Sequence, residues 1–338
     1  MNLVGPRLAQ SEARDPIETA RNWLETFDTV ALATVVSAWG SAPVPVGGQL
    51  VVAPDGRFEG SVSGGCVEID VVTEAHDAIA NAKPKLLEFG IADETAWRAG
   101  LPCGGTIKVF VEPLLSSDRD FIDHILAARR ARRLIAVATN LATGNRSLID
   151  PASAKDPEVA VWVSAGESGI VTLADEEVFL HVLMPAVLLV LAGATHITQV
   201  LADLAARIGY DVVIVDPRPA FASAARFDGM TVLEEWPEPS SASSAFDRRT
   251  ALVALTHAAH LDDEALAAAL RSDCFYVGAL GSRKTHAKRL ERLRAAGIAE
   301  DKLARIHAPV GLAIGAKGPA EIAVSILAEI VKVARGAD

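Results

Sequence analysis

From residue 186 to the end of the chain, two patterns of apolar residues alternate. Short runs rich in Val, Leu and Ile are separated by longer segments whose apolar residues fall three or four positions apart. The first pattern predicts buried strands and the second predicts amphipathic helices. Strands are expected over residues 187–191, 212–215, 251–255 and 274–277, and helices over residues 195–208, 262–270, 284–295 and 319–333. Strands that alternate with helices in this way predict a doubly wound parallel sheet.

Before residue 185 the pattern is mixed and predicts a smaller α/β domain. Asp55-Gly56 suits a tight hairpin turn between two of its strands. The expected strands cover residues 30–37, 49–53, 57–62, 85–89, 106–112 and 134–139, and the expected helices cover residues 16–27, 66–80 and 121–132. Residues 159–163 and 178–183 are expected to add strands to an antiparallel sheet. We therefore divide the chain into a polar leader (1–15), an N-terminal α/β domain with a middle extension (16–184) and a C-terminal domain (185–338).

Composition and charge narrow the classes of function. The chain has 338 residues, is 50% hydrophobic and carries a formal net charge of −11, which works against binding to nucleic acid. The basic run that starts at Arg283 is expected to be a solvated helix face. No apolar run is long enough to span a bilayer, and residues 1–15 do not resemble a secretory signal. The three cysteines are too widely spaced for a disulfide framework or a zinc motif, so we expect a cytoplasmic protein.

The C-terminal domain begins like a dinucleotide-binding, or Rossmann, fold. A strand ends in a turn at Gly193, a helix follows, and Asp216 closes the next strand. In such folds the turn directs backbone N–H groups at phosphate, and the acidic residue binds a ribose hydroxyl. Thr195 and Thr198 stand where the second and third glycines of the usual motif would be, which disfavours tight NAD(P) binding. The alternative is structural, with Gly193 only forming the turn and Asp216 capping the next segment.

Two later loops follow strands of the same expected sheet. His257 follows the third strand, and Ser282 and Arg283 follow a glycine-rich segment after the fourth. Ligands of open parallel sheets bind at the carboxyl ends of the strands, so these side chains are candidates for phosphate contact. His257 and His260 do not make a metal site, because no carboxylate or cysteine is poised to join them. An inert loop histidine and a packing loop are the alternatives.

A glycine-flanked cysteine carries the chemistry of the N-terminal half. Ser63-Gly64-Gly65-Cys66 is expected where a strand turns into a helix. Unpaired N–H groups and the positive end of the helix dipole favour a thiolate and attract an anion there. Glu68 is either a charge in the first turn of the helix or an acid/base group.

A second cysteine has a similar context. Cys103-Gly104-Gly105 places a thiol in another glycine-rich loop. Cys274 lies in a strand-like segment and is expected to be a small buried residue. Cys66 and Cys103 are therefore the two candidate reactive thiols, although nothing in the sequence alone brings them together.

Taken in order, these segments resemble the XdhC/CoxI family of molybdenum cofactor maturation proteins. The resemblance covers roughly residues 17–112 and 185–335. It is carried by Ser63-Gly64-Gly65-Cys66-Val67-Glu68, Cys103-Gly104-Gly105, the Gly193 turn with His196, Val215-Asp216-Pro217-Arg218, Thr256-His257, Gly278-Ala279-Leu280-Gly281-Ser282-Arg283-Lys284 and His307-Ala308-Pro309-Val310-Gly311-Leu312. The family usually has a second glycine where this chain has Thr195.

The resemblance implies a small N-terminal α/β domain joined to a C-terminal Rossmann domain. It implies a chaperone that binds molybdenum cofactor (molybdopterin) as cargo. The chaperone would support sulfuration of the cofactor with a cysteine desulfurase and its insertion into an apo-hydroxylase of the xanthine dehydrogenase or CO dehydrogenase type. In this interpretation Cys66 and Cys103 protect or orient the molybdenum–dithiolene group or handle the incoming sulfur, since thiolates suit soft partners. Glu68 is the third catalytic candidate. The cofactor-binding set is Ser63, Gly64, Gly65, Gly104, Gly105, Gly193, Thr195, His196, Asp216, His257, Ser282 and Arg283.

Two other classes of function stay open. One is an NAD(P)-dependent oxidoreductase with Cys66 or Cys103 as the catalytic thiol, and the other is a non-catalytic regulatory scaffold with an empty Rossmann domain. The N-terminal motifs have no clear role in either class, so we favour an accessory factor over a catalyst, with a homodimer as an alternative to a monomer. The interpretation requires that folding gather both thiols and the Gly193 turn around one cleft.

Overall fold

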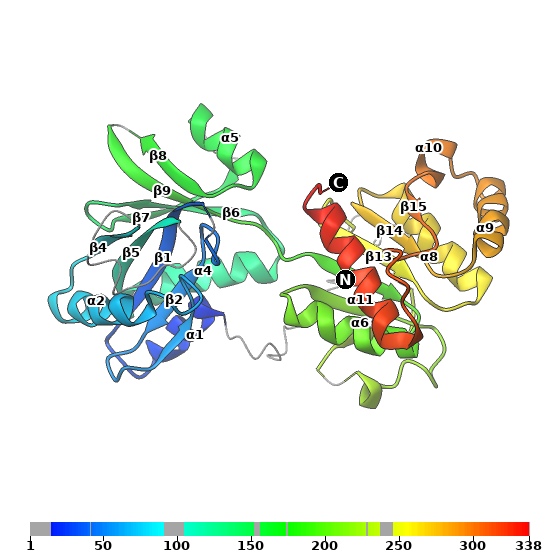
Figure 1. Ribbon diagram of the computed structural model, residues 1–338, viewed down its shortest axis with the longest axis horizontal. Helices are drawn as coiled ribbons and strands as arrows, with labels where there is room; N and C mark the ends of the chain where they lie inside the picture. Colours follow the sequence, from blue (N-terminus) through cyan, green and yellow to red (C-terminus); the bar gives the residue numbers. More distant parts are fainter. Residues whose placement is uncertain are drawn as a thin grey trace. The chain divides into compact units, whose positions relative to one another are not determined.

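The computed structural model describes residues 15–40, 42–90, 105–151, 156–173, 175–227, 229–236 and 246–337. The chain divides into two compact units, one ending at Pro185 and the other beginning at Ala186. Figure 1 shows the helices and strands of both units. None of the helices in the described ranges is both long and apolar enough to cross a membrane.

The N-terminal unit is built on a five-stranded antiparallel sheet in the order β3-β2-β1-β5-β4. Its strands are β1 (Thr29–Trp39), β2 (Gln49–Val52), β3 (Phe58–Gly60), β4 (Lys85–Phe89) and β5 (Thr106–Leu115). Helix α2 (Glu68–Asn81) packs on one face against Ala31, Ala33 and Val35. Because side chains alternate along a strand, Leu32 points to the opposite face, where α1 (Pro16–Trp23) and α4 (Arg119–Arg130) pack.

A second, four-stranded antiparallel sheet lies in the same unit, in the order β7-β6-β9-β8. Its strands are β6 (Ile135–Asn140), β7 (Arg146–Ile149), β8 (Gly169–Leu173) and β9 (Glu176–Leu183). Helix α5 (Pro157–Ala165) covers one face. The other face meets the first sheet, since Phe179 of β9 packs with Val36 of β1 and Phe110 of β5. A short helix, η1 (Ser116–Asp118), links β5 to α4.

The strand expected over residues 159–163 is wrong, because these residues form the middle of α5. The Asp156 side chain accepts hydrogen bonds from the backbone N–H groups of Glu158 (2.8 Å) and Val159 (3.3 Å). Pro157 occupies the first turn, and Gly166 ends the helix with φ of 69°. Asp, Pro and Gly at these positions are the usual signals of helix ends, and here they override the β-branched run between them.

The C-terminal unit contains a six-stranded parallel sheet in the order β12-β11-β10-β13-β14-β15. Its strands are β10 (Leu188–Ala192), β11 (Asp211–Val215), β12 (Thr231–Leu233), β13 (Thr250–Ala254), β14 (Tyr276–Ala279) and β15 (Ile306–His307). The doubly wound parallel sheet predicted from the sequence is therefore confirmed, and its strand order is that of the Rossmann fold. The order reverses between β10 and β13, which is where such sheets bind ligands.

Helices cover both faces of the parallel sheet. Alternate residues of β10 serve the two layers, with Leu189 and Leu191 facing one and Leu188 and Val190 facing the other. Burial on both faces explains why β10 is apolar throughout. Helices α6 (His196–Arg207) and α11 (Gly318–Ala334) lie side by side on one face, and α8 (Ala259–Arg271), α9 (Arg283–Ala295) and α10 (Glu300–Leu303) cover the other (Figure 1). A short helix, η3 (Ala224–Arg226), precedes β12.

Candidate functional site

One buried carboxylate organises the glycine loop before α2. Glu68 Oε1 accepts hydrogen bonds from the backbone N–H groups of Val62 (3.2 Å) and Ser63 (2.9 Å) and from the Ser61 hydroxyl (2.6 Å). Glu68 Oε2 accepts from the Gly65 N–H (2.8 Å) and from the Ser63 hydroxyl. Burial by itself would raise the pKa of this carboxyl, but the hydrogen bonds from Ser61 and Ser63 outweigh it and lower the pKa to about 2. A carboxylate that stays ionised and is saturated with donors is poorly suited to acid/base work at neutral pH.

The other N–H groups of this loop are also satisfied internally. The Ser63 hydroxyl oxygen accepts from the N–H groups of Cys66 and Val67 (both 3.0 Å), and the Ser61 hydroxyl oxygen accepts from Gly64 (2.9 Å). The N–H groups of Ser63, Gly64 and Gly65 are therefore paired within the loop, whereas the sequence predicted unpaired ones; cofactor binding by these residues stays a prediction. The physical reason is that Glu68 is itself the anion at this turn. What the loop offers is the partly buried Cys66 thiol on a rigid support.

Cys103 and Gly104 lie outside the described residues, so the predicted proximity of Cys103 to Cys66 stays a prediction. Gly105 is buried at the start of β5. The next residue, Thr106, pairs with Trp39 at the end of β1. Cys66 packs against a core cluster to which Ile107 of β5 also belongs.

In the C-terminal unit, the Gly193 turn is closed by its own neighbours. Gly193 has φ of +111°, and a Cβ placed there would lie 2.9 Å from the backbone nitrogen of Thr256. The Ala194 N–H donates to Asp216 Oδ2 (2.8 Å), and the Thr195 N–H donates to the hydroxyl of Thr198 (3.2 Å). These N–H groups lie where a pyrophosphate would bind in this fold, and they are already satisfied.

Of the two roles that the sequence allowed for Asp216, the hydrogen bonds fit the structural one, because its Oδ1 accepts from the Arg218 N–H (3.0 Å) of the following segment. Asp216 is fully buried, and the Arg218 guanidinium donates two hydrogen bonds to it, Nε to Oδ1 (2.8 Å) and Nη2 to Oδ2 (2.7 Å). Burial would raise the pKa of Asp216, but the Arg218 guanidinium and the Ala194 N–H lower it below the usual value. Asp216 therefore stabilises the Gly193 turn by accepting from the Ala194 N–H, and Thr195 is the N-cap residue of α6.

His257 lies beside the Gly193 turn, because its neighbour Thr256 contacts Gly193. His257 is exposed and has a positive φ of 60°, which is uncommon for a residue with a side chain. Buried Asp262 holds this loop by accepting from the Thr256 N–H (3.1 Å) and hydroxyl (2.7 Å). The structure thus brings Gly193, Asp216 and the His257 loop together at the carboxyl edge of the sheet.

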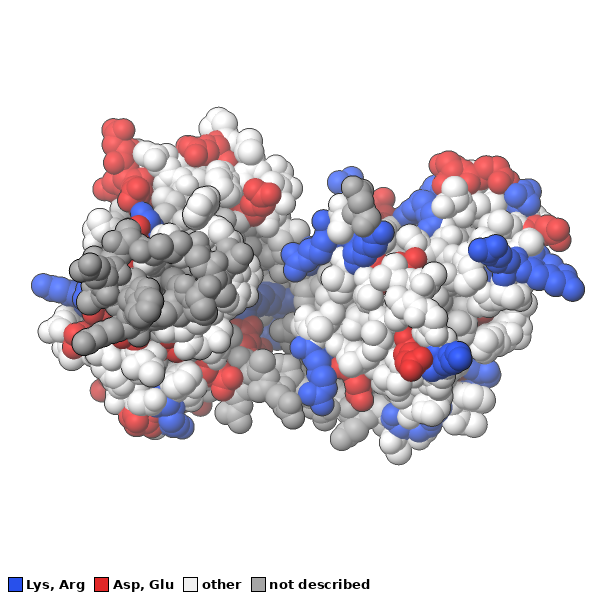
Figure 2. Space-filling view, in the orientation of Figure 1, with Lys and Arg blue, Asp and Glu red and all other residues white. Residues whose placement is uncertain are grey.

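The remaining predicted residues are exposed at helix starts. His196 is the first residue of α6, and Ser282 caps α9 by accepting from the Thr285 N–H (3.2 Å), with Arg283 beside it. Lys and Arg side chains cover α9 at the right-hand edge of the view in Figure 2, as a solvated basic face would. Arg289 departs from that face, because it is buried and its Nη2 donates to the Leu280 carbonyl (2.9 Å).

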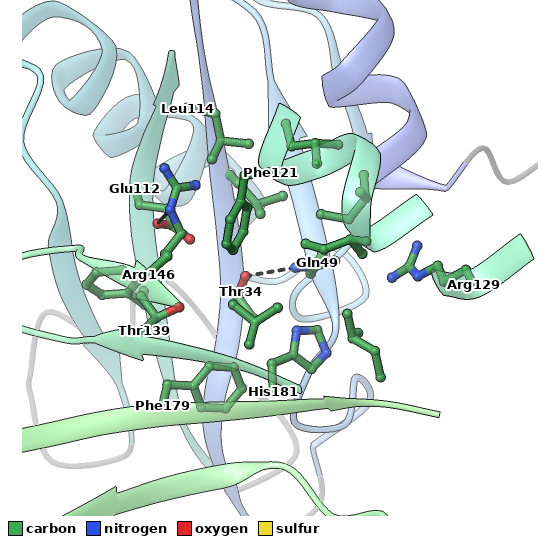
Figure 3. Close-up of a pocket in the computed structure, with 17 residues that line it drawn as sticks. Thr34, Gln49, Glu112, Leu114, Phe121, Arg129, Thr139, Arg146, Phe179 and His181 are labelled. Atoms are coloured by element: carbon green, nitrogen blue, oxygen red, sulfur yellow. Dashed lines mark hydrogen bonds and ion pairs between the residues drawn. The ribbon is translucent and has the colours of Figure 1, made fainter. Parts of the chain in front are cut away.

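Sequence reasoning missed a cavity between the two sheets of the N-terminal unit, which we term the inter-sheet cavity (Figure 3). Glu112 of β5, Arg146 of β7 and His181 of β9 line it, together with Thr34 and Gln49, which are joined by a hydrogen bond (3.2 Å). Burial raises the pKa of Glu112 to about 7, and the nearby Arg146 charge only partly offsets this. Burial also lowers the pKa of His181 to about 4. The available signal was the charged Glu112 inside an apolar strand.

Comparison with known proteins gives matches along both units. The model of the XdhC and CoxI family matches residues 23–90, and that of the XdhC Rossmann domain matches residues 189–330. The chain is 32% identical over 303 residues to the molybdenum cofactor insertion chaperone PaoD of Escherichia coli (strain K12), which covers 89% of this chain and 82% of that protein. It is 27% identical over 322 residues to a Bacillus subtilis (strain 168) protein named as a probable xanthine dehydrogenase subunit, which covers 91% and 94%. The crystal structure of a xanthine dehydrogenase from Bacillus halodurans superposes with a TM-score of 0.77 at 25% identity, covering 96% of this chain and 97% of that one.

Replacing Glu68 tests its role in the loop. We expect Glu68→Gln to lower the free energy of unfolding at pH 7 by about 2–4 kcal/mol, because an amide cannot accept all of the donors that surround it. The wild type should lose about 3 kcal/mol as the pH falls from about 4.5 towards 2, since the unfolded chain takes up the proton first. Urea unfolding at pH 7 measures the first effect, and its repetition at several pH values between 5 and 2 measures the second. Asp70→Asn, an exposed change in the same helical turn, is the control, and equal stability of the two variants would contradict the assignment.

Gly193→Ala tests the packing of the turn on Thr256. We expect the free energy of unfolding to fall by about 2–4 kcal/mol, because the positive φ of Gly193 and the short distance to the Thr256 backbone both disfavour a Cβ at this position. Gly209→Ala is the matched control, since Gly209 has φ of +86° but no atom within 4 Å of a built Cβ. The control should lose about 1 kcal/mol. Chemical denaturation of both variants checks this, and equal losses would show that the contact with Thr256 is unimportant.

The raised pKa of Glu112 predicts a pH-dependent stability. Between pH 5 and pH 8 the unfolded carboxyl is ionised, while the folded one changes from protonated to ionised. Folding of the wild type is therefore disfavoured as the pH rises. Between pH 5 and pH 8, the free energy of unfolding of Glu112→Gln should increase by about 2–3 kcal/mol relative to that of the wild type. Unfolding curves at the two pH values measure the gain. Glu88→Gln, an exposed change on β4, should show none, and a pH-independent difference for Glu112→Gln would refute the prediction.

Proposed function

Because the chain belongs to the XdhC and CoxI family, we propose that it is a chaperone that binds molybdenum cofactor and delivers it to a molybdenum hydroxylase. The observation that carries this proposal is the 32% identity to PaoD, which extends over 89% of the chain and so includes both units. That relative is named a molybdenum cofactor insertion chaperone. The name of the Bacillus subtilis relative refers to a probable xanthine dehydrogenase, which supports a hydroxylase of that type as the recipient.

The Cys66 loop is the proposed contact for the molybdenum end of the cargo. Molybdenum and its dithiolene sulfurs are soft groups, and a thiolate is a soft ligand. The internal bonds of Glu68 and Ser63 hold the backbone of the loop in place, so Cys66 is presented without ordering the chain first. We propose that Cys103 joins it, because Ile107, which follows it closely in the chain, belongs to the core cluster on which Cys66 packs.

The carboxyl edge of the parallel sheet is the proposed contact for the phosphate of the cargo. The N–H groups of Ala194 and Thr195 are already bonded, so exposed side chains around the turn supply the donors. These side chains are His196, His257, Ser282 and Arg283. The sealed Asp216 and the closed turn argue against the alternative of an NAD(P)-dependent oxidoreductase, because neither ribose nor pyrophosphate would find its usual partners.

Sulfuration of the bound cofactor is the finer part of the proposal. A cysteine desulfurase would supply the sulfur while Cys66 and Cys103 shield the molybdenum end from solvent. This cooperation requires that the desulfurase act on the loaded chaperone before the cargo reaches the apo-hydroxylase. The roles of the chaperone and of the desulfurase can therefore be separated in one reconstitution.

The test is to load purified protein with molybdenum cofactor, add cofactor-free hydroxylase, and measure bound molybdenum and restored activity with and without a cysteine desulfurase. We expect the wild type to bind the cofactor and to restore activity most fully with the desulfurase. Cys66→Ser with Cys103→Ser should lower activation at least tenfold, which corresponds to about 1.4 kcal/mol of lost interaction. Cys274→Ala, which changes a thiol buried in the other unit, should behave like the wild type.

Each outcome bears on one part of the proposal. Intact binding and activation after loss of both thiols would remove the thiols from the mechanism. Equal activation with and without the desulfurase would remove sulfuration. No bound molybdenum, together with a stable complex with the hydroxylase, would favour a scaffold instead of a cofactor chaperone.

A further inference from the structure

The inter-sheet cavity is separate from the Cys66 loop. Thr34 on β1 and Glu112 on β5 point into it. Their strand neighbours Ala33 and Val111 point to the opposite face of the same sheet, where α2 and Cys66 pack. The cavity has an empty volume of about 550 Å³, including the part that is open to solvent. The five-stranded sheet therefore lies between the inter-sheet cavity and the Cys66 loop.

One wall of the cavity carries an acceptor without a donor. Glu112 is 6% exposed, and its Oε2 is buried with no hydrogen-bond partner among the described residues. The Nε atom of Arg146 lies 3.6 Å away, which makes an ion pair but not a hydrogen bond. Leaving a buried acceptor without a donor costs about 1–3 kcal/mol. A ligand N–H group placed here would remove that cost.

The charges around the cavity are already balanced. Arg146 pairs with Asp118 (2.9 Å) as well as with Glu112, and Arg129 pairs with Asp15. His181 is neutral at pH 7, because burial holds its pKa at about 4. An anion such as phosphate would therefore find no uncompensated positive charge to offset its desolvation. The cavity suits an uncharged ligand.

The remaining walls are apolar, with three phenylalanine rings among aliphatic side chains. The rings of Phe110, Phe121 and Phe179 line the cavity, and the Phe179 and His181 rings lie 5.6 Å apart at an angle of 35°. The Arg146 guanidinium lies over the Phe121 ring at 5.4 Å. Figure 3 shows Glu112 and Arg146 side by side next to Phe121, with Thr34, Gln49 and His181 along the floor. Three phenylalanine rings together with a few converging polar groups favour a planar ring that has a polar edge.

We infer that the inter-sheet cavity binds an uncharged planar nitrogen heterocycle through a lactam edge, with the ring N–H donating to Glu112 Oε2 and the adjacent carbonyl accepting from Arg146 Nε. This edge is shared by oxopurines and by the pterin ring. A purine would make the cavity a site of its own. A pterin would make it a site for the ring of the cargo, which rests on the proposed chaperone function and would exclude Cys66 as the contact for the molybdenum end, because the sheet lies between them. Both share one chemistry, and the choice between them is experimental.

Binding to the wild type tests the inference without any substitution. Hypoxanthine and pterin are titrated by calorimetry against the full chain, beside 1-methylhypoxanthine and 3-methylpterin, in which a methyl group replaces the lactam N–H proton. At least one parent compound should bind, and its methylated analogue should bind at least tenfold more weakly. Binding of hypoxanthine alone identifies a purine site, and binding of pterin alone identifies a site for the cargo ring. Failure of both, equal affinity of the methylated analogue, or displacement by inorganic phosphate would overturn the inference.

Glu112→Met removes the acceptor and keeps the size of the side chain. We expect at least tenfold weaker binding of the parent heterocycle, together with a free energy of unfolding at pH 8 that is not lower than that of the wild type. This combination separates loss of the ligand contact from loss of the fold. Cys274→Ala, a change buried in the other unit, should leave heterocycle binding unchanged. Undiminished binding by Glu112→Met would overturn the inference.

Discussion

Backbone N–H groups at tight turns need acceptors, and in this protein buried carboxylates supply them. Glu68 accepts from the loop before α2, Asp216 from the Gly193 turn, and Asp262 from Thr256. Hydrogen bonds lower the pKa of Glu68 and of Asp216, so these two carboxylates stay ionised although they are buried. The loops are therefore ordered before any ligand arrives, and their exposed side chains, not their backbone, are left to make contacts.

The C-terminal unit combines the strand order of the Rossmann fold with a first turn whose Ala194 and Thr195 N–H groups are bonded internally. The strand order and the switch point depend only on apolar strands buried between two helical layers. Dinucleotide binding further requires free N–H groups at the first turn and an open carboxylate after the second strand. Here the Ala194 and Thr195 N–H groups donate to Asp216 and Thr198. The Arg218 guanidinium donates two hydrogen bonds to the Asp216 carboxylate. A sheet of this kind retains its geometry at the carboxyl edge and is free to bind a different ligand there.

The sequence predicted what depends on local periodicity. The parallel sheet, the hairpin at Asp55-Gly56 and α2 follow from patterns that act over a few residues. The strand predicted over residues 159–163 was wrong, because the signals of helix ends at Asp156 and Gly166 lie outside the β-branched run that suggested a strand. The role of Asp216 could not be read from its spacing, since a carboxylate after the second strand serves a ribose or a turn equally well. Glu112, Arg146 and His181 come from three strands of two sheets, so no local pattern could bring them together.

Two buried carboxylates of the N-terminal unit, Glu68 and Glu112, have opposite hydrogen-bonding environments. Glu68 is surrounded by donors, and its pKa falls to about 2, whereas Glu112 has an oxygen without a donor, and its pKa rises to about 7. The first carboxylate stabilises a loop and the second destabilises a cavity wall, although the same sheet supports both. A strand position that needs only packing is filled at lower cost by Leu or Met. The presence of Glu at position 112, next to Arg146 and three aromatic rings, is therefore explained better by a ligand that completes its hydrogen bonds than by the stability of the sheet.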